Sequence, residues 1–188
     1  IYIPYGNKIY VIENSKVEEY TELYSDCNDI FKQVKSMAFN SIGDIYTISD
    51  ETLYKVNWDK TIESINIEDI ISEDMVDKYN VFHDIITNEL GEVYAVVYSG
   101  EGYESQYYLY KINDIDNIEL CKDVLVEKDR IEVCPSYYIT SQDKSIICVF
   151  EKDNSYEFYR YKEGKLDKIT EANKEDSLNI NVSLMEGI

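Results

Sequence analysis

The apolar residues of this chain fall into short runs separated by polar turns, and the clearest example spans residues 35–67. Within it, the runs 35–40, 45–49, 52–57 and 61–67 are rich in β-branched and aromatic residues, which favour strands. Gly, Asn, Asp and Ser concentrate between the runs, as is typical of hairpin connections. The pattern therefore predicts four hairpin-linked strands, named A to D in chain order, in one twisted antiparallel sheet.

This unit recurs along the chain with a period of roughly 47 residues, which is the signature of a repeat architecture. Strand B begins at four equivalent positions, namely Ile1, Ile45, Val93 and Ile146. Successive intervals are 44, 48 and 53 residues, and the interval from Ile146 through the C-terminus back to Ile1 is 43 residues. Four units therefore fit the chain, with one unit shared between its two ends. The chain opens on strand B, and a strand A is expected within 178–188.

Some of the predicted strands, such as 93–97 and 146–150, are apolar on both faces. A sheet built from such strands must be covered on both sides. Each unit repeats the pattern Gly-Asp/Glu-Ile/Val-Tyr, followed by Leu-Tyr-Lys-Ile/Val-Asn. Repeated four-stranded sheets that are covered on both faces by their neighbours resemble the blades of a β-propeller. The resemblance covers nearly the whole chain but concerns architecture alone, because the sequence has no WD or kelch signature.

The predicted fold class is therefore all-β: a four-bladed β-propeller of four-stranded antiparallel blades, with the first blade closed by the C-terminal strand. Residues 1–188 would form a single domain with the blades 178–188 plus 1–25, 33–67, 81–125 and 135–171. The alternative is a four-blade piece of a larger propeller. Closure is favoured because an open stack would leave an apolar face and an unpaired strand edge at each end. Residues 66–80 do not follow the strand pattern, because Ile and Val recur there at nearly helical spacing. This spacing predicts a short helix that links strand D of one blade to strand A of the next.

The chain carries 38 acidic and 18 basic residues, which gives a formal net charge of −20. That charge opposes binding to phosphate backbones and anionic membrane surfaces, so we expect no nucleic-acid partner. No apolar run approaches the roughly 20 residues that cross a bilayer, so we expect no direct membrane insertion by this chain. The charge favours a basic protein or peptide as partner. A glycan is the other partner considered, because tyrosine rings can stack on sugars.

Few residues are candidates for catalysis or metal binding. The one histidine, His83, stands at the entry to a predicted strand A, and no serine lies in the glycine pattern of a nucleophile elbow. A single histidine excludes a three-histidine metal site, and the acidic turns 26–29 and 114–117 lack EF-hand spacing. No glycine-rich nucleotide motif occurs either. We therefore expect no catalytic residue, no metal and no cofactor.

The four cysteines, Cys27, Cys121, Cys134 and Cys148, show no CxxC spacing and no neighbouring histidine. Cys148 lies in an apolar run and is expected to be buried. Cys121 and Cys134 could form a disulfide in an exported protein, but sequence alone does not fix connectivity. Both states of this pair stay open.

The candidate site follows from the topology of a propeller, in which the B to C turns and the D to A links emerge on one face. Binding residues concentrate on loops that a rigid scaffold holds. In this chain the B to C turns are acidic and carry tyrosines. The candidate ligand-binding residues are Tyr5, Asp50, Glu51, Glu101, Tyr103 and Asp153. We call this surface the turn face.

These observations favour a binding domain over an enzyme. The predicted function is a non-catalytic, extracellular or cell-surface domain that binds a protein or peptide, or senses a ligand, through the turn face. The alternative is a carbohydrate-binding or glycan-processing propeller, which would act as a hydrolase if two acids converged at the mouth of the channel.

Overall fold

The computed structural model describes residues 1–24, 33–71, 78–100, 106–124, 126–128, 131–133, 135–140 and 143–174. Antiparallel sheets make up this part of the chain, and its only helical elements are the short 3₁₀ segments η2 (Ile67–Asp69) and η5 (Lys122–Val124). The predicted fold class is confirmed: the protein is all-β and propeller-like. The linking helix expected over 66–80 is reduced to η2 in the described residues, while 72–77 lie outside them.

The first two sheets come from the N-terminal half of the chain. The first has three strands, β1 (Tyr2–Tyr5), β2 (Lys8–Glu13) and β3 (Lys16–Glu22). The second has four, β4 (Ser36–Phe39), β5 (Ile45–Ile48), β6 (Thr52–Val56) and β7 (Ile62–Asn66). Every neighbouring pair is antiparallel and consecutive in sequence. Both sheets are therefore simple meanders, as the alternation of apolar runs and turns predicts.

The next two sheets repeat this arrangement. One contains β8 (Asn80–Thr87), β9 (Val93–Ser99), β10 (Gln106–Asp114) and β11 (Asn117–Leu120). The other contains β14 (Tyr137–Thr140), β15 (Ile146–Glu151), β16 (Ser155–Lys162) and β17 (Lys165–Asn173). Between them lies a separate hairpin of β12 (Val126–Lys128) and β13 (Ile131–Val133). This inserted hairpin accounts for the longest interval of the repeat, between Val93 and Ile146.

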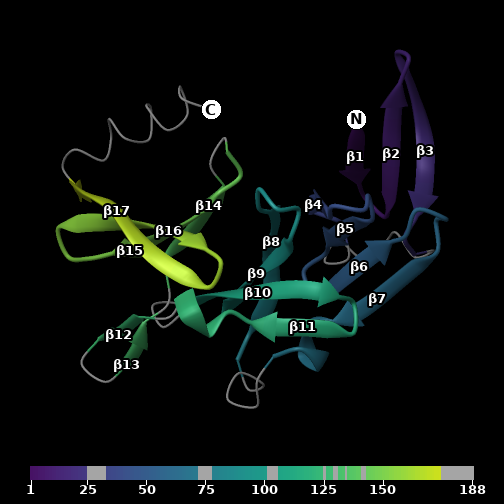
Figure 1. Cartoon of the computed structure of the whole chain (residues 1–188). Coiled ribbons are helices and arrows are strands. Elements are labelled where there is room, and N and C mark those ends of the chain that lie inside the picture. The colour runs from purple at the N-terminus through teal and green to yellow at the C-terminus, as the bar shows by residue number, and fades with distance from the viewer. Residues whose placement is uncertain are drawn as a thin grey trace.

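The sheets follow one another along an arc, with the first and fourth sheets at its two ends (Figure 1). Among the described residues no strand of β14–β17 pairs with β1–β3. The predicted closing strand at 178–188 lies outside the described residues, so closure of the first blade stays a prediction. The first sheet accordingly shows three strands, in the order expected for B, C and D.

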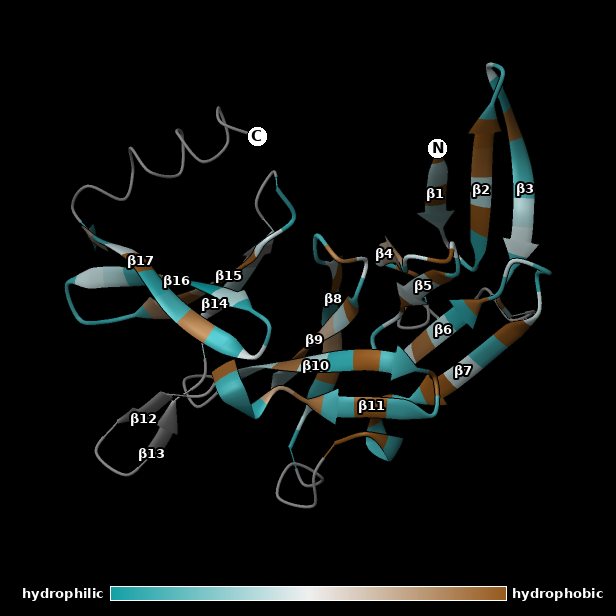
Figure 2. Ribbon diagram, viewed as in Figure 1, coloured by the Kyte–Doolittle hydropathy of each residue, from teal (hydrophilic) through white to brown (hydrophobic). Residues whose placement is uncertain are grey.

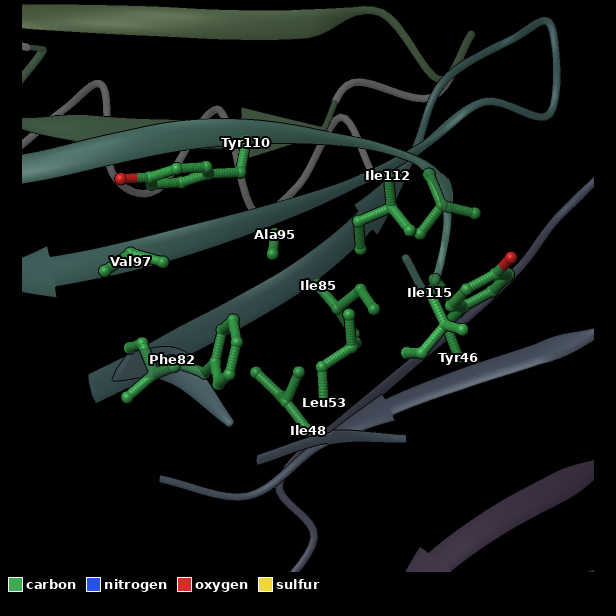
Figure 3. Close-up of a cluster of buried hydrophobic side chains, with 13 residues drawn as sticks. Tyr46, Ile48, Leu53, Phe82, Ile85, Ala95, Val97, Tyr110, Ile112 and Ile115 are labelled. Carbon is green, nitrogen blue, oxygen red and sulfur yellow. The ribbon is translucent and has the colours of Figure 1, made fainter. Parts of the chain in front are cut away.

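A separate hydrophobic cluster fills each gap between consecutive sheets. Ile9, Tyr54 and Val56 belong to the cluster between the first and second sheets. The largest cluster lies between the second and third sheets, where Leu53 and Phe82 meet from opposite sides (Figure 3). A third cluster, between the third and fourth sheets, includes Cys148 and other buried residues of β9, β10, β15 and β16. Such stacking explains why the middle strands are apolar on both faces.

Burial falls from the second strand of a sheet to its last strand. All four residues of β5 are buried, as are six of the seven in β9. In contrast, β3 and β11 have no buried residue, and hydrophilic residues prevail on β3 (Figure 2). The last strand of each meander therefore faces solvent on the outside of the arc.

Backbone hydrogen bonds repeat at equivalent places in the B to C turns. The backbone N–H of the residue just after strand D donates a hydrogen bond to the carbonyl oxygen of the residue just before strand C. The three bonds run from Leu23 to Asn7, from Ile67 to Glu51 and from Lys174 to Asn154, at 2.8, 2.8 and 2.9 Å. One residue earlier in the turn, the carbonyl oxygens of Gly6 and Asp50 accept bonds from Val34 and Phe82, at the start of the next sheet. These bonds join the turns at Gly6 and Asp50 both to their own sheet and to the sheet that follows. Because they use main-chain atoms, they tolerate changes of side chain.

Candidate binding site

Residues of the third sheet and of the start of the fourth sheet surround a cavity of about 250 Å³. The side chains that line it are those of His83, Asp84, Val96, Tyr107, Ser136 and Tyr138. We call this space the inner cavity. It lies between the third and fourth sheets, toward the N-terminal ends of β8, β10 and β14, on the side where the B to C turns emerge. The inner cavity is therefore on the same side of the molecule as the predicted turn face.

A β-bulge shapes the inner cavity at His83. Phe82 pairs with Val97 and Asp84 pairs with Val96, so His83 is an extra residue that opposes no partner. The bulge lets two apolar side chains three positions apart, Phe82 and Ile85, enter the same buried cluster. In a regular strand, residues on one face are separated by an even number of positions. The bulge also leaves His83 exposed beside the cavity, where bulges commonly re-aim a side chain.

Asp84 is held in place by two hydrogen bonds to the same carboxylate oxygen. Ser36 Oγ, on the first strand of the preceding sheet, donates to Asp84 Oδ1 at 2.5 Å. The backbone N–H of Ile85 donates to the same oxygen at 2.8 Å. Within the described part of the chain, Oδ2 receives no recorded hydrogen bond and can serve a ligand. The carboxylate is therefore fixed by the second sheet while it lines a cavity shared with the fourth.

Tyrosines form the aromatic wall of the inner cavity. The ring of Tyr107 packs edge-to-face against His83, with centroids 5.0 Å apart, and against Tyr98, at 5.4 Å. The hydroxyl of Tyr138 donates to the carbonyl oxygen of Tyr107 at 3.4 Å, which links the third and fourth sheets. These contacts fix the rings before any ligand arrives.

Ser136 connects the inner cavity to the turn face. Its Oγ accepts a hydrogen bond of 3.1 Å from the backbone N–H of Glu151, at the end of β15. Glu151 in turn pairs with Lys174 at 2.6 Å, next to the B to C turn that contains Asp153. The cavity wall and this turn are thus parts of one hydrogen-bonded structure.

The structure places the predicted site residues in different environments. Tyr5 is 75% exposed, and Glu51 and Asp153 are also exposed. Asp50 is half-buried and its carboxylate pairs with Lys35 of the same sheet. Glu101 and Tyr103 lie outside the described residues. Tyr5 is on the first sheet, so the described residues of the turn face come from three sheets.

Lysines neutralise part of the acidic charge near the turn face. Glu157, on β16, accepts hydrogen bonds from Lys152 at 2.7 Å and from Lys168. These two ammonium groups lower the pKa of the Glu157 carboxyl from 4.5 to about 2. Glu51 and Asp153 have no recorded ion pair in the described part of the chain.

Among the described residues that line the inner cavity, Asp84 is the one carboxylate. Glycoside hydrolysis generally uses a pair of acids. Within the described ranges no three side chains of metal-binding type gather at one place. None of the helices described is long and apolar enough to span a membrane.

The sequence predicted the turn face as the candidate site and gave no prediction of the inner cavity. It placed His83 at the entry to a predicted strand A, yet it did not single out Ser36, Tyr107 or Ser136. The odd spacing of buried residues across His83 was a usable signal, because Phe82 and Ile85 can share a face only if the strand is bulged. The contact between Ser36 and Asp84 had no sequence signal, since 48 residues separate them.

Comparisons with known proteins support the fold alone. No family model matches the chain, and no curated protein matches it. A solved structure of a protein from Lactobacillus plantarum superposes with a TM-score of 0.53 at 12% sequence identity, over 88% of this chain and 49% of that one. The chain thus spans about half the length of that protein. A structure of a protein proposed to be a gluconolactonase reaches a TM-score of 0.49 at 12% identity, over 87% and 55% of the two chains, which is too weak to carry an argument.

Proposed function

We propose that this protein is a non-catalytic recognition domain that binds a basic segment of a protein or peptide on the turn face. The inner cavity would receive one basic side chain of that segment. The observation that carries the proposal is the position of Asp84, a fixed carboxylate beside two tyrosines in a cavity of about 250 Å³. Location outside the cell or on its surface belongs to the same proposal.

The inner cavity matches the two parts of a lysine or arginine side chain. The carboxylate of Asp84 complements the positive charge, and a partly desolvated ion pair of this kind directs specificity. Tyr107 and Tyr138 offer aromatic surface to the aliphatic stem, and their ring faces attract cations at close range. Because both rings are already held by the contacts described above, little side-chain entropy would be lost on binding.

Outside the cavity, the exposed acids Glu51 and Asp153 would contribute to the rate of association more than to the lifetime of the complex. Exposed charges steer an oppositely charged partner over a range set by the ionic strength. The net charge of −20 acts in the same direction. Binding should therefore weaken as salt increases.

The test is calorimetric titration with short peptides that carry a single Lys or Arg, compared with peptides in which that residue is norleucine or citrulline. Asp84→Asn should weaken binding of the basic peptides by about tenfold or more, as expected for loss of a partly buried charge partner. Asp116→Asn is the matched control, because Asp116 is an exposed acid in the turn between β10 and β11. Equal affinity for basic and neutral peptides would contradict the proposal.

The turn face has its own test. Substituting Asp50, Glu101 and Asp153 with Ser should slow association and reduce its salt dependence. Asp50→Ser also removes the partner of Lys35, so the melting temperature should be measured for each single variant. Unchanged affinity and unchanged association rate for the triple variant would reject the role of this face.

A glycan is the competing ligand, because a carboxylate beside tyrosine rings also suits a sugar. Screening of the protein on a glycan array distinguishes the two. Retention of a neutral oligosaccharide that Asp84→Asn abolishes, with no binding of basic peptides, would replace the peptide proposal with the carbohydrate one. Release of a reducing sugar would further show hydrolysis.

A further inference from the structure

A second cavity, of about 270 Å³, lies between the third and fourth sheets on the side opposite the turn face. Its walls come from the turn before β9, from the ends of β10 and β11, from η5, and from the turn between β16 and β17. We call it the lateral cavity. It shares no lining residue with the inner cavity, so the two spaces are separate sites.

The floor of the lateral cavity is uncharged and aromatic. Tyr94 and Tyr161 are buried there, with ring centroids 6.3 Å apart in an edge-to-face arrangement. Cys121, a free thiol that is 7% exposed, lies on the same floor. Burial raises the pKa of Cys121 to about 11 and also raises the pKa of both tyrosines. The floor therefore stays neutral at physiological pH and presents weakly polar surface.

One wall is a fixed ion pair. Glu92 accepts hydrogen bonds from Lys111 Nζ at 2.5 Å, from Asn88 Nδ2 at 2.6 Å and from the Tyr94 hydroxyl at 3.0 Å. Burial acts to raise the pKa of Glu92, but these three donors outweigh it and lower the pKa overall. Glu92 and Lys111 thus neutralise each other, and they contribute little net charge to the cavity.

The other charged side chains that line the lateral cavity in the described part of the chain are all negative. Glu119, Asp123 and Glu163 line it and are exposed. Glu119 accepts one hydrogen bond, from Asn113 Nδ2 at 3.2 Å, while Asp123 and Glu163 have no recorded ion pair within the described ranges. These three carboxylates would repel an anionic ligand, whereas a cation would supply a counter-charge for them.

We propose that the lateral cavity binds an aliphatic amine, in particular a small diamine whose carbon chain lies on the aromatic floor. A compact metal ion fits less well, because the described residues provide no cluster of three metal-binding side chains here. An organic cation needs no such cluster. Its ammonium group pairs with carboxylates, and its methylene groups cover tyrosine rings and the half-buried Leu120.

An amine in this cavity would also strengthen the junction between the two sheets. At present a salt bridge of 3.1 Å between Glu89 and Lys162 joins them near the cavity. A bound ligand would contact Asp123, in η5 just after the third sheet, and Glu163, in a turn of the fourth sheet. Since the ligand binds only the folded protein, it should raise the melting temperature.

The experiment is titration of the protein with putrescine, followed by calorimetry and by thermal unfolding. Butane-1,4-diol serves as the neutral analogue of the same length. We expect putrescine to bind and to raise the melting temperature, and the diol to do neither. The double variant Glu119→Gln/Asp123→Asn should weaken putrescine binding at least tenfold. Both positions are exposed, so the variant should fold normally, which circular dichroism checks.

Two control variants assign the site. Asp167→Asn removes an exposed acid of β17 that does not line the cavity, and should leave putrescine affinity unchanged. Asp84→Asn, which alters only the inner cavity, should also leave it unchanged. If Asp84→Asn abolishes binding while the double variant does not, the amine belongs to the inner cavity and the present proposal is wrong. Equal effects of the double variant and Asp167→Asn would show a general counter-ion effect and would likewise overturn it.

Discussion

Gly91 of the third sheet lies against Ser41 of the second, so closely that a Cβ built on Gly91 would stand 2.8 Å from the Cβ of Ser41. Both residues belong to turns between a first and a second strand, and the two turns are alike. In each, an asparagine, Asn40 or Asn88, caps the turn by accepting two backbone hydrogen bonds with its Oδ1. Consecutive sheets therefore pack through their turns as well as through their clusters of buried side chains.

This contact predicts that Gly91→Ala destabilises the protein more than Gly43→Ala. Both glycines have positive φ, +75° and +94°, so an alanine is strained at either position. Only at Gly91 does the new methyl group also collide with another sheet, whereas nothing lies within 4 Å of a Cβ at Gly43. We expect a loss of about 1 kcal/mol at Gly43 and of about 2–3 kcal/mol at Gly91, measured by urea unfolding. Equal losses would mean that the two turns do not pack as described.

A converse change is available in the fourth sheet. Lys144 occupies the corresponding turn with a φ of +61° and is exposed. A residue other than glycine is strained in this conformation, so Lys144→Gly should stabilise the protein by roughly 0.5–1 kcal/mol. Asp116→Gly, at an exposed turn residue without positive φ, is the comparison, and it should be neutral or destabilising. The readout is the free energy of unfolding of both variants.

The ion pair of Lys55 and Asp114 predicts a second effect on stability. Lys55 is 8% exposed, and its Nζ lies 2.5 Å from Asp114 Oδ1 across the second and third sheets. Asp114→Asn leaves the buried ammonium group without a full counter-charge, which should cost roughly 2 kcal/mol; the half-exposed Asp114 side chain keeps the loss below that of a fully buried pair. Lys55→Met should cost less. In a double-mutant cycle the combined variant should be less destabilised than the sum of the two single variants, and strict additivity would contradict the coupling.

Glu157 predicts how stability depends on pH. Its folded pKa of about 2 lies below the ordinary 4.5, because Lys152 and Lys168 donate to the carboxylate. Its contribution is therefore fully present above about pH 4.5 and is lost as the pH falls toward 2. Glu157→Gln should cost about 1 kcal/mol at pH 7, and this difference from the wild type should shrink between pH 4.5 and pH 2. A difference that does not change with pH would show that the charge of Glu157 is not what stabilises the sheet.

Closure of the first blade remains open to a direct test. If residues 178–188 supply the missing first strand, their deletion exposes the edge of β1 and should cause unfolding or aggregation. Size-exclusion chromatography and thermal melting would detect either result. A monomeric deletion variant that melts as the full chain does would show that the segment does not close the sheet.

Much of the fold could be predicted from the sequence because it depends on local patterning. The runs around Ile45, Val93 and Ile146 form strands because β-branched and aromatic residues fit a pleated surface, and turns fall where Asn and Gly supply the needed conformations. Apolar residues on both faces of β9 require a neighbour on each side, which leads directly to stacked sheets.

Only the tertiary structure decided which residues meet around the two cavities. Ser36 reaches Asp84, and Tyr138 reaches Tyr107, because separate sheets stack at a particular distance and rotation. The bulge at His83 then directs the His83 side chain toward the inner cavity. These contacts arise from packing between elements far apart in the chain, and no local pattern of polar and apolar residues encodes them. The sequence by itself determined the strands, the turns and the need for stacked sheets, while packing decided the sites.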